Sequence, residues 1–191
     1  LPQPDGDDLI TAITTAVLGL DRSYLAVQGP PGTGKTYVAS HVIKRLVEQG
    51  WRVGVVSQGH AAVEHLLDAC VRAGVDPAVV GKLKARSESP TWTALAKERD
   101  LRDLLDRSAD VGCVVGGTAW DFSSTKKFAD AELDLLVVDE AGQFSLANTV
   151  ASARAANRLL LLGDPQQLPQ VSQGIHPAPV DQSALSWLAD G

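Results

Sequence analysis

Short apolar runs alternate with longer amphipathic segments along the chain, which is the pattern of a parallel sheet covered by helices on both faces. The apolar runs predict buried strands at 23–27, 52–57, 111–118, 133–143 and 157–169, with polar residues at the end of the later ones. Apolar residues spaced three to four apart predict helices at 7–19, 35–50, 61–74 and 91–108. The tail 174–191 predicts a proline-containing loop followed by a short helix.

Residues 75–110 interrupt this alternation. They hold one candidate strand, "VVGKLKAR", followed by an amphipathic helix with oppositely charged residues four apart. We therefore expect a small insertion here, within a single α/β domain that covers residues 1–191.

Composition narrows the class of protein. The chain has 191 residues, 45% of them hydrophobic, and contains no apolar run of roughly 20 residues that could span a bilayer. Its start, "LPQPDGDDLI", lacks the features of a signal peptide. A cytoplasmic protein without a membrane partner is the expectation.

Charge and cysteine usage add further limits. A net charge of -6 argues against a generally basic, nucleic-acid-coating surface, although it allows a local groove. Cys70 and Cys113 match no zinc or redox spacing, so we expect both to be buried. His60, His65 and Cys70 lie five apart and would scatter around a helix, so no metal is assigned to them. The chain has no methionine and no Lys or Arg after Arg158, which indicates a segment of a longer protein.

The stretch "GPPGTGKT" matches the phosphate-binding pattern G-x-x-x-x-G-K-[ST] between a predicted strand and a predicted helix. Gly32 and Gly34 allow backbone amides to surround phosphate oxygens, and the following helix adds its positive end. Lys35 is expected to reach the β- and γ-phosphates, and the Thr36 hydroxyl to bind Mg²⁺. The candidate nucleotide-binding residues are Gly29, Pro30, Pro31, Gly32, Thr33, Gly34, Lys35 and Thr36.

Two further polar clusters follow buried strands. Asp139, after "LLVV", is the candidate carboxylate for Mg²⁺, directly or through water, and Glu140 is the candidate for orienting the attacking water. In "LLLLGDPQQLPQ" the residues Asp164, Gln166 and Gln167 lie on a Gly-Pro turn, where an amide could sense the γ-phosphate. Because carboxyl ends of parallel strands share one edge of the sheet, all three clusters are expected at one site.

These residues leave several phosphate-handling classes to compare. Gly142 after Asp139 makes the D-x-x-G of GTPases, but no N-K-x-D for guanine follows. A small-molecule kinase would be expected to carry basic lid residues late in the chain, and the segment after Arg158 has none.

Five stretches occur in the order and approximate spacing of motifs I, Ia, Ic, II and III of superfamily 1 helicases: "GPPGTGKT", "VSQGHAAVEHLL", "CVVGGTAW", "LLVVDEAGQ" and "LLLLGDPQQLPQV". The chain resembles the first RecA-like domain of the B subgroup over residues 7–171, and is most similar to bacterial RecB-like nuclease-helicase fusions. The resemblance implies ATP and Mg²⁺ as cofactors, bound by a RecA-like P-loop fold.

The resemblance also implies roles for single residues. Lys35, Glu140 and Gln167 would act in catalysis, with Gln143 and Gln167 sensing the γ-phosphate. Single-stranded DNA or RNA would contact Ser57, Gly59, His60 and Thr118, and Trp120 is a candidate for stacking a base or, equally, for packing in the core.

This chain departs from the family's pattern at two positions. Leu9 stands where the family places a glutamine that reads adenine, with Gln3 nearby but outside the helix. Gln58 stands where motif Ia commonly has proline.

Motifs IV to VI, which lie on a second RecA-like domain in this family, are missing from the chain. We therefore expect the ATP-hydrolysing motor domain of a superfamily 1B-like helicase that needs this partner domain, with a fused nuclease as a further partner. The 191-residue chain alone would bind nucleotide without unwinding. A stand-alone P-loop ATPase or kinase and a nucleotide-gated interaction module are the alternatives.

Overall fold

The computed structural model describes residues 6–167 and 176–190. Its centre is a seven-stranded sheet in which every strand pair is parallel. From one edge to the other, the strands are β1 (Tyr24–Gln28), β7 (Leu159–Gly163), β6 (Leu135–Val138), β2 (Arg52–Val56), β5 (Cys113–Gly117), β3 (Val80–Leu83) and β4 (Thr93–Leu95).

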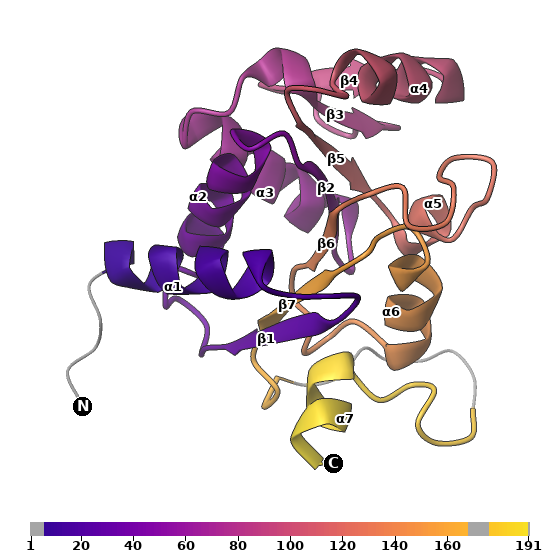
Figure 1. Ribbon diagram of the computed structural model, residues 1–191. Coiled ribbons are helices and arrows are strands. Elements are labelled where there is room, and N and C mark those ends of the chain that lie inside the picture. The colour runs from indigo at the N-terminus through magenta and orange to yellow at the C-terminus, as the bar shows by residue number, and fades with distance from the viewer. Residues whose placement is uncertain (1–5, 168–175, 191) are drawn as a thin grey trace.

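Helices cover both faces of this sheet (Figure 1). One face carries α1 (Gly6–Leu18), α2 (Lys35–Val47) and α3 (His60–Arg72). The other carries α4 (Glu98–Arg107), α5 (Ala119–Phe122), α6 (Leu146–Ala153) and α7 (Ala184–Asp190). The predicted α/β fold with two helical layers is confirmed.

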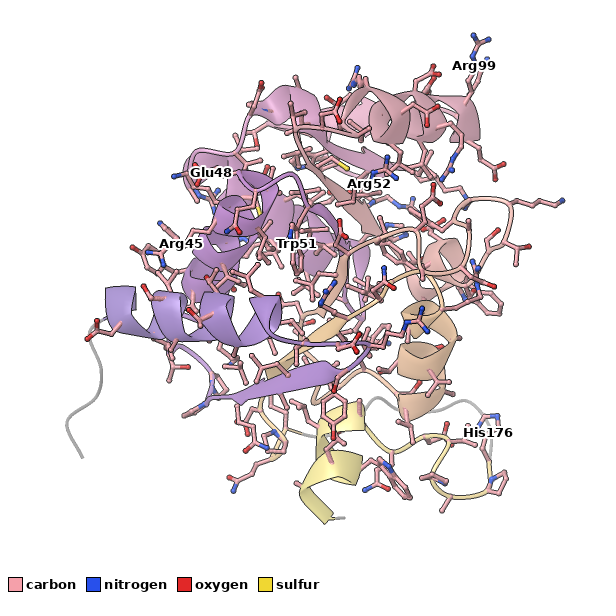
Figure 2. The ribbon with its side chains drawn as sticks, in the orientation of Figure 1. Arg45, Glu48, Trp51, Arg52, Arg99 and His176 are labelled. Carbon is pink, nitrogen blue, oxygen red and sulfur yellow. The ribbon has the colours of Figure 1, made fainter. Side chains whose placement is uncertain are left out.

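The alternation of side chains along each strand builds two hydrophobic cores. In β6, Leu135 and Val137 pack with the α1–α3 layer, whereas Leu136 and Val138 pack with the other. Successive side chains point to opposite faces of a strand, so the uninterrupted apolar run "LLVV" is what a strand buried on both faces requires. The first layer is further joined by a 2.8 Å hydrogen bond from Arg45 to the Thr11 hydroxyl on α1. Figure 2 labels Arg45 on α2.

Residues 75–110 extend the sheet. A short 3-10 helix, Pro77–Val79, leads into β3, which pairs with β5, and β4 pairs with β3. The predicted helix over 91–108 was wrong in its first part, because Thr93–Leu95 forms the edge strand β4. The Asp100 carboxylate accepts the backbone N–H of Lys97 at 2.8 Å, which fixes the start of α4 at Glu98.

Two other findings concern the cysteines and the possibility of a membrane-spanning helix. Cys70 and Cys113 are buried and unpaired, as predicted, and burial raises the pKa of each thiol to about 12. Every helix in residues 6–167 and 176–190 is too short or too polar to span a bilayer.

Candidate active site

The phosphate-binding loop connects β1 to α2 at the carboxyl edge of the sheet. Gly32 and Gly34 have φ angles of 78° and 79°, in the left-handed region that glycine adopts without strain. The Gly29 amide donates to the carbonyl of Gly163 at 3.0 Å, which attaches the start of the loop to the end of β7. The helix that follows begins at Lys35, so its unpaired amides face the loop.

Polar side chains of the loop bind its own backbone. The Lys35 ammonium donates to the carbonyls of Gly29 at 2.6 Å and Pro30 at 2.8 Å. The Thr33 hydroxyl also donates to Pro30, at 2.8 Å. The lysine is therefore held against the concave loop in which phosphate would bind.

A cleft of about 570 Å³ lies beside this loop and gathers the three predicted clusters. Its lining includes the candidates for Mg²⁺ and water activation and the γ-phosphate sensors Gln143 and Gln167, but not Asp164 or Gln166 of the predicted turn. It also includes Gln58 and His65, which were not predicted there. The lining residues are Pro31, Lys35, Thr36, Gln58, Gly59, Ala61, Ala62, His65, Asp139, Glu140, Gln143, Gly163 and Gln167. The four-residue spacing of Ala61 and His65 on one helix face is the sequence signal that could have placed His65 here.

Asp139 follows β6 directly, and its backbone amide donates to Val56 at 2.9 Å. Burial raises the pKa of its carboxyl, and the nearby Glu140 charge acts in the same direction. A cation in the cleft would favour the ionised form. Thr36 and Asp139 are oxygen donors on the same cleft, which fits a Mg²⁺ ion held by one carboxylate, a hydroxyl and nucleotide phosphates.

Glu140 has a φ angle of 56°, an uncommon conformation for a residue with a side chain. The next turn holds it there, because its carbonyl accepts the amide of Gln143 at 2.8 Å. Its carboxylate accepts a 3.0 Å hydrogen bond from the Ser57 hydroxyl at the end of β2. Backbone strain of this kind concentrates at functional positions, and here it accompanies the carboxylate that Ser57 binds.

The candidate γ-phosphate sensors lie in contact. The Gln143 amide donates to the side-chain oxygen of Gln167 at 3.1 Å. The two loops approach closely because Gly142 has no side chain: a Cβ atom there would lie 1.9 Å from the carbonyl oxygen of Asp164. Gly142, the glycine of the D-x-x-G pattern, is therefore explained by close packing against the loop that follows β7.

The predicted nucleic-acid residues follow the adjacent strands β2 and β5. Gly59 is exposed, His60 begins α3, and the Thr118 hydroxyl caps α5 and donates to Asp121 at 2.8 Å. Ser57 is buried, and its hydroxyl points to Glu140, so it faces the nucleotide side of this edge. Trp120 is 84% exposed, which excludes packing in the core. Contact of these residues with nucleic acid stays a prediction.

A buried network of charged side chains, which was not predicted from the sequence, stabilises the carboxyl edge of the sheet. Lys82 on β3 is fully buried and lies 3.1 Å from the Glu64 carboxylate and 2.9 Å from His60 Nδ1. Glu64 also accepts the backbone amides of Arg86 at 2.7 Å and Ser87 at 3.0 Å. The network thus fastens the loop after β3 to the start of α3.

The charges of this network shift the pKa values of its members. Burial and the nearby Lys82 and Arg86 charges lower the pKa of His60. Burial alone would raise the pKa of Glu64, but the hydrogen bonds from Arg86 and Lys82 outweigh it and the pKa is lowered.

Replacing Lys82 with Met is expected to lower the free energy of unfolding by about 3 kcal/mol, since removal of one partner leaves a buried carboxylate without its counter-charge. Urea denaturation measures the change. Because folding lowers the pKa of Glu64, the pair stabilises above the unfolded-state pKa, and this contribution is lost as the pH falls through the folded-state pKa. The loss of unfolding free energy in the Lys82→Met variant should therefore become smaller as the pH is lowered.

The matched control is Lys44→Met, which removes a surface ion pair between the partly exposed Lys44 and the exposed Glu48 and should cost at most about 0.5 kcal/mol. Equal effects of the two substitutions would show that the buried pair does not stabilise the fold.

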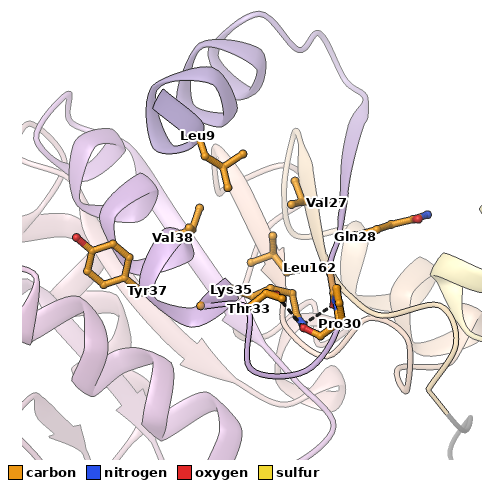
Figure 3. A pocket seen from close by; sticks show the side chains of 11 residues that line it. Leu9, Val27, Gln28, Pro30, Thr33, Lys35, Tyr37, Val38 and Leu162 are labelled. Atoms are coloured by element: carbon orange, nitrogen blue, oxygen red, sulfur yellow. Dashed lines mark hydrogen bonds between the residues drawn. The ribbon is translucent and has the colours of Figure 1, made fainter. Parts of the chain in front are cut away.

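A second cavity, of about 540 Å³, lies on the other side of the phosphate loop, between α1, α2 and the end of β1 (Figure 3). Leu9, which the resemblance to superfamily 1 helicases aligns with an adenine-reading glutamine, lines it. Gln3 lies outside the described residues.

Comparison with known proteins places these features in a family. The family model described as an AAA domain matches residues 11–182. The chain is 29% identical over 153 residues to the DNA replication ATP-dependent helicase/nuclease DNA2 of Saccharomyces cerevisiae, and 27% identical over 157 residues to JHS1 of Arabidopsis thaliana, which bears the same description. These matches cover 78% and 80% of the chain but only 10% and 11% of those proteins.

Two further matches concern other enzymes. A tetraacyldisaccharide 4'-kinase of Polynucleobacter necessarius is 25% identical over 125 residues, covering 59% of the chain and 34% of the kinase. A nuclease-deletion mutant of the Type ISP restriction-modification enzyme LlaGI, solved with a DNA substrate mimic, superimposes with a TM-score of 0.61 at 13% identity. That match covers 96% of the chain and 18% of LlaGI, and it supports the fold alone.

Proposed function

The chain belongs to the AAA domain family and is a RecA-like domain of the superfamily 1 helicase type, and we propose that it is the ATP-hydrolysing motor domain of a helicase. The observation that carries the proposal is the single cleft in which Lys35, Thr36, Asp139, Glu140 and the Gln143–Gln167 pair meet. Residues suited to phosphate binding, to holding Mg²⁺ and to activating the attacking water of in-line phosphoryl transfer all line this cleft.

In this mechanism, the loop amides and Lys35 bind the phosphates, and Thr36 with Asp139 would hold Mg²⁺. The ion, when bound, neutralises charge on the phosphate oxygens. Glu140 orients a water molecule toward the γ-phosphate and accepts its proton. Ser57 keeps the Glu140 carboxylate in place through its 3.0 Å hydrogen bond.

The Gln143–Gln167 contact supports a role in coupling. Both amides line the cleft that would face the γ-phosphate, and both belong to loops that end neighbouring strands. Loss of the phosphate would change their hydrogen bonds, and we infer that a second RecA-like domain of the parent protein reads this change. That domain would also supply an arginine whose charge stabilisation is worth about 10³–10⁵ in rate.

Single-stranded nucleic acid is the proposed track of the motor. The loops after β2, β5 and β3 are neighbours at the carboxyl edge, and they present His60, Thr118 and the exposed Trp120. Lys84 and Arg86, both exposed on the loop that Glu64 fastens, add positive charge on an otherwise acidic protein. The DNA-acting relatives favour DNA over RNA. A fused nuclease and a cytoplasmic location stay predictions.

Trp120 provides a direct test of this track. Trp120→Ala in the parent protein should weaken binding of a single-stranded oligonucleotide by about 5- to 100-fold, because stacking of one base contributes about 1–3 kcal/mol. Fluorescence anisotropy at fixed salt measures it. Trp187→Ala, which removes another exposed tryptophan, on α7, is the control and should bind normally. An unchanged oligonucleotide affinity of Trp120→Ala would show that Trp120 does not contact the single strand.

The alternative classes predict other behaviour. A stand-alone kinase, the class of the Polynucleobacter relative, would transfer phosphate to a small acceptor and ignore single strands. A nucleotide-gated interaction module would need binding at Lys35 but no hydrolysis at Glu140.

A further inference from the structure

The cavity between α1 and α2 lies where the base of a bound nucleotide would extend from the phosphate loop. Pro30, Thr33, Gly34 and Lys35 form its floor, so the phosphate site and this cavity are continuous. The remaining lining residues are Leu9, Val27, Gln28, Gly29, Tyr37, Val38 and Leu162.

The walls of this cavity are apolar where they enclose its interior. Figure 3 shows Leu9, Val27, Val38 and Leu162 around the open space above the loop. Such walls stabilise the flat faces of a base by excluding water, and this contact is the same for different purines.

The polar side chains that line the cavity do not point into its interior. The Lys35 ammonium and the Thr33 hydroxyl donate to loop carbonyls. Figure 3 shows the amide of Gln28 and the hydroxyl of Tyr37 pointing away from the space beneath Leu9. The Tyr37 ring packs on His41, with 4.1 Å between the ring centroids. Among the described side chains that line the cavity, none therefore presents a donor or acceptor to the edge of a base.

Leu9 is held in this wall by the packing of its helix. Its neighbours Ile10, Ile13 and Val17 are buried between α1 and the sheet, while Leu9 itself is 36% exposed. The Arg45–Thr11 hydrogen bond further joins α1 to α2. A side chain at position 9 thus faces the cavity without being part of the hydrophobic core.

We propose that this domain binds purine nucleoside triphosphates without reading the edge of the base, so that it takes GTP as readily as ATP. The inference rests on the proposed function and specifies its substrate class. Adenine and guanine have nearly the same shape and differ in the donors and acceptors along one edge. A site discriminates strongly between such ligands when its own buried polar groups would be left unpaired by the wrong one, and an apolar wall discriminates weakly.

The test measures competition of unlabelled ATP and GTP against a ribose-labelled fluorescent ATP on the full chain of 191 residues with Mg²⁺. We expect the two dissociation constants to agree within tenfold. A preference for ATP of more than tenfold would overturn the inference while leaving the proposed function intact. Absence of binding by both nucleotides would instead contradict the proposed function.

Leu9→Gln tests where the base lies. A glutamine amide can bind the N6 and N7 edge of adenine with two hydrogen bonds, which guanine cannot match. The variant should shift the ATP-to-GTP affinity ratio about three- to tenfold toward ATP. Leu18→Gln, at a similarly exposed position of the same helix, is the matched control and should leave the ratio unchanged. An unchanged ratio in Leu9→Gln would show that the base does not contact this wall.

Discussion

Glu140→Gln in the parent protein is expected to lower the rate of ATP hydrolysis by about 10²–10⁴-fold, the usual contribution of a positioned general base. Glutamine keeps the size of the side chain and can still bond with Ser57, but it cannot accept the proton of the attacking water. Nucleotide affinity should remain within a few-fold of the wild-type value, because the phosphate-binding residues are unchanged. Steady-state phosphate release and equilibrium binding of a labelled nucleotide measure the two quantities separately.

The control for this variant is Glu48→Gln, an exposed position at the end of α2, where turnover should not change. Normal hydrolysis by Glu140→Gln would show that another group activates the water, and the assignment of Glu140 would be wrong. A loss of nucleotide binding in the same variant would show that Glu140 contributes to nucleotide binding instead of catalysis.

Lys35→Ala is expected to abolish turnover, because the variant should bind nucleotide more weakly and should also stabilise the transition state less. Loss of hydrogen bonds from a charged donor, worth about 1.5–3 kcal/mol, should weaken nucleotide binding roughly 10- to 100-fold. Removal of positive charge from the transferred phosphoryl group should lower the maximal rate by a further factor of about 10²–10³. Titration with labelled nucleotide and phosphate release at saturating ATP measure the two effects.

Lys44→Ala tests whether the effect is specific to the loop, since Lys44 lies about two and a half turns along the same helix and outside the cleft. It should bind and hydrolyse nucleotide normally. Wild-type affinity and turnover in Lys35→Ala would mean that the loop does not hold the phosphates of a substrate.

The sequence was sufficient to predict the phosphate loop and its partners because their chemistry is local. Gly32, Gly34 and Lys35 have fixed spacing, and Asp139 and Gln167 each follow an apolar strand that had to be buried. Parallel strands bring their carboxyl ends to one edge, so the convergence of these residues followed from the strand pattern.

The parts that were missed depend on contacts between distant residues. Lys82 reads as a surface residue in "VVGKLKAR", yet it is buried because Glu64 and His60, on another element, provide its partners. Thr93–Leu95 lies within an amphipathic pattern, but its place beside β3 makes it a strand. The bond from Ser57 to Glu140 joins residues 83 positions apart, and no local pattern indicates it.

The ATP hydrolysis rate of the parent protein, measured with and without a single-stranded oligonucleotide, decides whether this is the motor domain of a helicase. We expect a low basal rate that rises at least several-fold as the protein becomes saturated with the strand, and a rise that is lost in Glu140→Gln. A rate that is the same at every strand concentration would show that the domain is not a helicase motor.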